Sequence, residues 1–266
     1  MKKVMIWGML AMIAGSLLLI GCKKEEVAET DLTSAEDQSQ GELNYDLVFK
    51  QVDLAANDNG LKKGAYPIVT IDTSVSPRTM NVYYGETNYL CLDGNYRRGT
   101  INVSWTGRYR ADGTIISITF DKFYQNDNLV EGTKTVTNVG RNTNGKMVFT
   151  IVVNGKITNT AGTSHTWNSN RTRTWIEGEG TPVVTDDIYE ITGTTSGVNR
   201  NGISYTSTIT EKLRVDLGCE WRITSGVIEI TPSGKSMRKV DFGNGACDKI
   251  ITVTVNGKTK TFERRK

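Results

Sequence analysis

Residues 147–154 read MVFTIVVN, and this stretch decides the fold class. Its odd-numbered positions are apolar, and polar or β-branched residues occupy the even-numbered ones. Alternation with a period of two predicts a β-strand that buries one face. The same pattern returns between Ile101 and Tyr109 and between Ile203 and Leu217, with Ser and Thr largely on the second face. Such a solvated face is typical of antiparallel sheets.

Asn-Gly pairs recur along the chain, and Asn and Gly tolerate the positive φ that tight hairpin turns need. The pairs are Asn144-Gly145, Asn154-Gly155, Asn201-Gly202, Asn244-Gly245 and Asn256-Gly257. We therefore expect residues 61–266 to form an all-β body, an antiparallel meander of about a dozen strands. Two arrangements fit, a sandwich and an open barrel. Residues 153–156 repeat at 255–258 as Val-Asn-Gly-Lys, through either an internal duplication or the shared needs of tight turns.

One short helix is expected before this body. Thr33-Ser34-Ala35-Glu36 resembles a capping box, but Gly41 interrupts the segment that follows it. Apolar residues then recur at helical spacing, so the helix is predicted within residues 42–60, over about Glu42–Ala56 and ending at turn residues. Residues 22–41 are predicted to be an acidic tether.

The N-terminus has the layout of a secretory signal peptide, with Lys2 and Lys3 before the apolar run Val4–Ile20. Leu19-Ile20-Gly21-Cys22 resembles the lipobox of bacterial lipoproteins. The resemblance implies that residues 1–21 are removed and that Cys22 carries diacylglycerol and a further acyl chain such as palmitate. The membrane would then be a partner through this lipid. The alternative is a plain signal peptide or anchor with a chance cysteine.

The residues after Cys22 suggest where in the cell the protein is located. Lys24-Glu25-Glu26 resembles the signal that exports lipoproteins to the surface of Bacteroidetes-type bacteria. Segments of the body also resemble uncharacterised Bacteroidetes-type lipoproteins, namely Gly107-Arg108-Tyr109, 131–134, 189–193, 200–202, 218–221, 241–248 and 254–259. These resemblances imply an outer-membrane protein that faces the cell exterior, and they carry no activity. An ordinary solvated linker before an inward-facing body is the alternative.

Lipidation of Cys22 would leave three of the four cysteines, in a compartment that permits disulfides. Cys219 and Cys247 are the closest pair in sequence, so their loop is the easiest to close. We predict that they form a disulfide and that Cys91 is a buried free thiol.

The chain offers no complete catalytic constellation, and we expect no catalytic residue, metal or cofactor. It has a single histidine, whereas catalytic zinc usually has two or three. Neither a nucleophile elbow nor a phosphate-binding glycine loop is present. The enzymatic alternative is a carbohydrate-active hydrolase with paired carboxylates, for which the candidates are Glu177, Glu179, Asp186 and Asp187.

One stretch is chemically richer than its neighbours. On a strand, five candidate binding residues share a face: His165, Trp167, Arg171, Arg173 and Trp175. Aromatic and guanidinium groups on an open sheet suit acidic sugars, but the same residues suit a core in which arginine stems cover tryptophan. Residues 22–60 hold ten acidic and three basic side chains, which leaves the body basic. Basic side chains either attract an anionic partner or simply solubilise the outward faces of the strands. We expect a non-catalytic binding or structural role, with an anionic polysaccharide as the candidate ligand and no nucleic acid.

Overall fold

The computed structural model of the chain describes residues 31–56, 66–181 and 183–264. The predicted signal peptide, the lipobox with Cys22, the tether up to residue 30 and residues 57–65 lie outside this described part. Among the described residues, none of the helices combines the length and the apolar character that crossing a membrane requires.

The body is a single antiparallel sheet, which confirms the all-β meander. The sheet has fourteen strands, and each pairs with the next along the chain except that β3 lies beside the main path on β4. The strands are β1 (Ile68–Asp72), β2 (Arg78–Tyr83), β3 (Tyr89–Leu90), β4 (Tyr96–Trp105), β5 (Ile115–Gln125), β6 (Asn128–Arg141), β7 (Met147–Thr158), β8 (Ser164–Glu177), β9 (Ile188–Val198), β10 (Ser204–Asp216), β11 (Ile223–Pro232), β12 (Arg238–Asn244), β13 (Ile250–Val255) and β14 (Lys258–Glu263). A 3₁₀ turn, η1 (Val184–Asp186), precedes β9.

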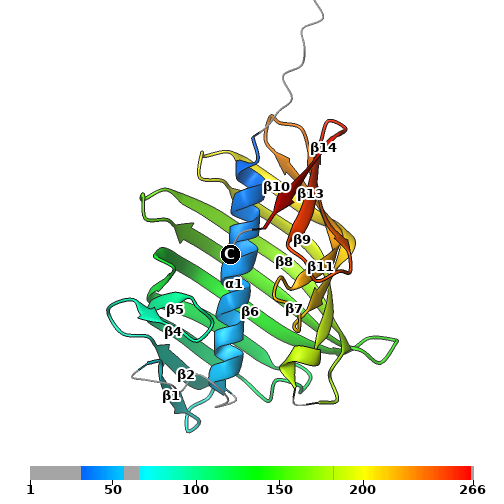
Figure 1. Cartoon of the computed structure of the whole chain (residues 1–266). Helices are drawn as coiled ribbons and strands as arrows, with labels where there is room; N and C mark the ends of the chain where they lie inside the picture. The colour runs from blue at the N-terminus through cyan, green and yellow to red at the C-terminus, as the bar shows by residue number, and fades with distance from the viewer. Residues whose placement is uncertain (1–30, 57–65, 182, 265–266) are drawn as a thin grey trace, which may run out of the picture.

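Because all of these strands share one sheet, the sandwich arrangement is wrong. The path begins at β1 and ends at β14 without closing. Helix α1 (Thr33–Ala56) lies across one face of the sheet, at an angle to the strands, and the C-terminal strands turn toward the same side (Figure 1). We call the face that α1 covers the inner face and the opposite one the outer face.

The helix is longer than predicted, since it begins at Thr33 and not at Glu42. Residues 33–41 of the expected tether are therefore helical. The carboxylate of Asp31 accepts the Thr33 backbone N–H at 2.9 Å and the Thr33 hydroxyl at 2.6 Å. An acid at this position satisfies a free amide and complements the helix dipole, so α1 starts here even though its first turns are polar.

One predicted turn is wrong. Asn154-Gly155 lies inside β7, whereas Asn144-Gly145, Asn201-Gly202 and Asn256-Gly257 lie between strands and Asn244-Gly245 lies at the end of β12. Gly155 serves a different purpose, because a Cβ there would lie 2.2 Å from the Tyr45 hydroxyl oxygen. The missing side chain lets α1 approach β7 closely. The two Val-Asn-Gly-Lys segments thus adopt different structures, a strand and a hairpin turn.

Two apolar clusters hold the layers together. The C-terminal half of α1 packs Tyr45, Val48, Val52 and Ala55 against buried residues of β2, β4, β5 and β7. Near its start, Ala35 packs among Tyr205, Ile209 and other buried residues of β10–β13. The sheet therefore contacts both ends of the helix.

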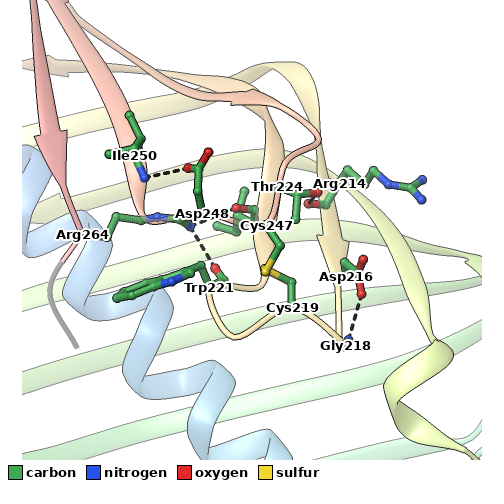
Figure 2. Close-up of a disulfide and its surroundings, with 11 residues drawn as sticks. Arg214, Asp216, Gly218, Cys219, Trp221, Thr224, Cys247, Asp248, Ile250 and Arg264 are labelled. Atoms are coloured by element: carbon green, nitrogen blue, oxygen red, sulfur yellow. Dashed lines mark hydrogen bonds between the residues drawn. A yellow bond between two sulfur atoms is a disulfide. The ribbon is translucent and has the colours of Figure 1, made fainter.

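The predicted disulfide is confirmed. Cys219 and Cys247 are bonded, with their Cα atoms 5.6 Å apart, and Cys91 is free and buried. Figure 2 shows how the bridge ties the β10–β11 connection to the β12–β13 connection. Beside it, the Arg264 guanidinium donates to the backbone carbonyls of Trp221 and Ile223 at 2.9 Å, which fixes the end of the described chain.

Candidate functional site

Strand β8 carries the predicted cluster on a single face. His165, Trp167, Arg171, Arg173 and Trp175 alternate with more exposed residues along the strand, as expected. Of the two alternatives, the open sugar-binding platform is wrong and the buried arrangement is the one observed, because these five residues are only 3–7% exposed. They lie on the inner face, where α1 contacts β8 and covers it.

The N-terminal half of α1 is bound to this face mainly by polar groups. The Trp167 indole donates to the Gln38 side-chain oxygen at 3.1 Å. The Arg171 guanidinium donates to the Glu42 carboxylate at 3.0 Å. Gly41 lies against the indole ring, since a Cβ there would be 2.4 Å from Trp167 Cγ.

A second polar contact anchors the start of the helix. Asp37 is fully buried and accepts the Arg200 backbone N–H and the Arg200 Nε, both at 2.7 Å. The Asn199 amide donates to the Ser34 hydroxyl at 2.9 Å. These bonds tie residues 34–37 to the turn between β9 and β10.

His165 belongs to the same region and lies beside Asp37. Its Nδ1 lies 3.8 Å from the Asp37 carboxylate. Burial lowers the pKa of the imidazole although the Asp37 charge opposes this, so His165 is neutral at neutral pH. Its Nε2 has no hydrogen-bond partner among the described residues.

Arg173 and Trp175 are core residues. The Arg173 guanidinium lies 4.7–5.1 Å from the ring centroids of Phe49, Phe149 and Tyr189, and it donates to the Tyr109 hydroxyl. Aromatic faces of this kind stabilise a buried cation. The Trp175 indole donates to Asp187 at 3.1 Å. Neither residue is available to a ligand, which corrects their assignment to a binding surface.

Arg171 leaves more of its hydrogen-bonding capacity unused than Arg173, whose Nε is also buried without a partner among the described residues. The Nε and Nη1 of Arg171 are buried without a hydrogen-bond partner in the described part of the chain. The hydroxyls of Ser169, Thr195 and Ser207 are likewise buried and unpartnered there. Buried polar groups without partners are rare and costly, so this region is under-bonded.

The three hydroxyls form a row. Ser169 on β8 is paired with Thr195 on β9, which is paired with Ser207 on β10. We call Ser169, Arg171, Thr195 and Ser207 the inner polar patch. Helix α1 contacts β8 on one side and β11 on the other, so this patch lies beneath it. The sequence analysis did not predict Thr195 and Ser207 as site residues, because Ser and Thr in alternating strands usually lie on the solvated face.

The carboxylates of the enzymatic alternative point to separate partners. Glu177 pairs with Arg214 at 3.4 Å, and Glu179 pairs with Arg141. Asp186 accepts a hydrogen bond from Thr181 at 2.9 Å. Only Asp187 is buried, where desolvation raises its pKa against hydrogen bonds from Tyr189 and Trp175.

A cleft and a trough are among the hollows of the surface. A cleft of about 240 Å³ lies beside the end of α1, lined by Lys50, Leu54, Tyr89 and Cys91 among others. A wide, shallow trough of about 930 Å³ crosses the ends of β8–β11 on the outer face, lined by Thr166, Asn168, Ser196 and Lys235 among others. Lys235 pairs with Asp31 and is not a free cation. Within the described ranges, no group of three or more His, Cys, Asp or Glu side chains is placed to hold a metal ion.

Comparisons with known proteins gave no match to this chain, whether with family models, with curated proteins or with solved structures.

Proposed function

We propose that this protein is a lipid-anchored protein of the outer membrane, displayed on the cell exterior, that binds an acidic glycan without catalysing a reaction. Its binding surface is the inner polar patch together with Trp167. The observation that carries the proposal is the state of Arg171. This buried guanidinium pairs with one carboxylate, that of Glu42, and two of its nitrogens, Nε and Nη1, have no partner among the described residues.

The neighbours of Arg171 suit a sugar. The Trp167 indole offers its N–H, which Gln38 accepts in this structure, while Tyr45 stacks on its ring at a centroid distance of 5.5 Å. The row of hydroxyls lies at register positions between Trp167 and Arg171 on the strand. A sugar acid presents one carboxylate and several hydroxyls, so it matches a guanidinium beside unpartnered hydroxyls.

A binding measurement tests this proposal. Polygalacturonate is added to the mature, lipidated protein in detergent, and its affinity is compared with that for a neutral polysaccharide. We expect Glu42→Gln to bind polygalacturonate about fivefold more tightly, because a charge-assisted hydrogen bond exceeds a neutral one by ~1 kcal/mol. The double variant Arg171→Gln/Glu42→Gln should lose at least about tenfold, and added salt should weaken wild-type binding.

The double variant removes both partners of one ion pair, which is close to neutral for stability, so its loss of binding would not reflect unfolding. Arg214→Gln is the matched control, since Arg214 pairs with the exposed Glu177 far from the patch. Equal affinities for all four proteins would rule out this site. Cleavage of the polysaccharide, abolished by Asp187→Asn, would favour the hydrolase alternative.

The proposed anchoring in the outer membrane gives a second prediction. Cys22→Ser removes the thiol to which the lipid would be attached. We expect the variant to leave the membrane fraction or to remain unprocessed, whereas wild type is cleaved and membrane-bound. Protease added to intact cells should digest the wild-type body. A Cys22→Ser protein that is cleaved and still sediments with membranes would contradict lipid anchoring.

A further inference from the structure

Helix α1 consists of two halves that are held by different forces. The buried residues of its C-terminal half include Tyr45, Val48, Val52 and Ala55, whereas the N-terminal half buries Ser34, Asp37, Gln38 and Gly41, with Ala35 as its apolar contact. Burial of large apolar side chains is the stronger force, at about 1.5–3 kcal/mol each. The C-terminal half is therefore the firm anchor of the helix.

A closed network of hydrogen bonds also supports the C-terminal half. Asn44 accepts from Gln125 at 2.9 Å, Gln125 accepts from Arg97 at 3.2 Å, and Arg97 is bound by Asp93. Gln51 accepts from the Tyr84 hydroxyl at 3.0 Å and donates to Asp93. These polar groups satisfy one another, in contrast to the inner polar patch.

The N-terminal half is held by bonds that a ligand or water can replace. Glu42 illustrates this, because burial raises the pKa of its carboxyl although Arg171 opposes the shift. A desolvated ion pair gains little over its solvated parts, since the cost of desolvation offsets the attraction. Exchange of Glu42 for a ligand carboxylate keeps Arg171 paired, so it avoids the cost of leaving a buried charge without a partner.

Gly41 lies between the two halves. Glycine inside a helix costs roughly 0.5–1 kcal/mol relative to alanine, because it has more conformational freedom to lose. The position tolerates no larger residue, since a Cβ would overlap the Trp167 ring. The residue that permits the helix to dock on Trp167 thus also weakens the helix at the boundary.

We infer that residues 33–42 occupy the ligand site and lift away from it when a sugar acid binds. The helix bends in the segment that follows Gly41, and residues 45–56 stay docked. This inference rests on the proposed function and adds its regulation. The ligand carboxylate takes the place of Glu42 on Arg171, and its hydroxyls bond to the unpartnered groups of Ser169, Thr195 and Ser207. Access to the site is then set by the segment that joins the body to its lipid tether.

Thiol labelling tests the inference on the full mature chain. Ser207→Cys places a thiol in the inner polar patch, and the native Cys91 is buried beside the C-terminal half of α1 as a reference within the same molecule. With a maleimide probe, we expect polygalacturonate to accelerate labelling at position 207 at least tenfold and to leave Cys91 unchanged. Binding without acceleration would overturn the displacement and leave the proposed function standing.

A second labelling experiment needs no ligand and therefore tests the inference even if polygalacturonate does not bind. Gly41→Ala forces a Cβ against Trp167, so position 207 should label at least tenfold faster than in the Ser207→Cys parent, again with Cys91 unchanged. Equal acceleration at both thiols would indicate opening of the whole helix and would overturn the hinge. Unchanged labelling at both would overturn it as well.

Discussion

Arg97→Met is expected to destabilise the protein by about 3–5 kcal/mol, the usual cost of removing one partner of a buried ion pair. The Arg97 side chain is fully buried and donates to both oxygens of Asp93 at 2.8 Å. Its Nε also donates to Gln125, which holds Asn44 of α1. Methionine fills a similar volume but leaves Asp93 and Gln125 without this donor. Equilibrium unfolding in urea measures the loss.

Arg98→Met is the matched control, because the adjacent side chain points to the outer face. Arg98 pairs with Asp127, whose side chain is 47% exposed, and such surface pairs contribute about 1 kcal/mol or less. Similar small effects for both variants would contradict the structural role of Arg97.

This ion pair also predicts an effect of acid. Burial opposes ionisation of Asp93, but the hydrogen bonds and charge of Arg97 prevail and hold its pKa below the ordinary value. The contribution is present above the ordinary pKa of Asp, and it is lost as pH falls below that value toward the folded-state pKa. The Arg97→Met variant should lose less stability than wild type over this acidic range.

Replacing Cys219 and Cys247 together with alanine should cost about 3–4 kcal/mol on the loop-entropy model, given their separation of 28 residues. In the unfolded chain the bridge holds Cys219 and Cys247 together, which lowers the conformational entropy of the unfolded state. In the folded chain it joins the connections on either side of β11 and β12 (Figure 2). The double variant should unfold at lower urea concentration and respond no further to a reducing agent. Cys91→Ala is the control for loss of a thiol.

Wild-type protein that is equally stable with and without reductant would contradict this prediction. So would peptide mapping under non-reducing conditions that places Cys91 in the bridge.

Part of this structure was predictable from local pattern. Alternation at Met147–Val153 predicted β7 and its buried face, and the same rule placed Trp167 and Arg171 on one face of β8. The disulfide was predicted from the short sequence separation of Cys219 and Cys247, because the entropic cost of closing a loop depends on its length in any fold.

The rest depends on what lies on the inner face, which a sequence pattern does not reveal. Residues 33–41 are too polar for a sequence pattern to mark a buried side, yet one side of this segment is buried against polar partners from β8 and the β9–β10 turn. Gly155 resembles a turn residue, but its role is to admit Tyr45. Trp167 and Arg171 suit an open surface and a polar interface equally well, so only the position of α1 distinguishes the two.

Amide hydrogen exchange on the lipidated protein, with and without polygalacturonate, tests the central claim most directly. Exchange reports local opening segment by segment. The structure predicts that the ligand makes residues 33–41 exchange faster, slows exchange in the neighbouring parts of β8–β10 and leaves residues 45–56 as they were. Slower exchange throughout residues 33–56 on binding would contradict displacement of the helix, and exchange that polygalacturonate does not alter anywhere would contradict binding at this face.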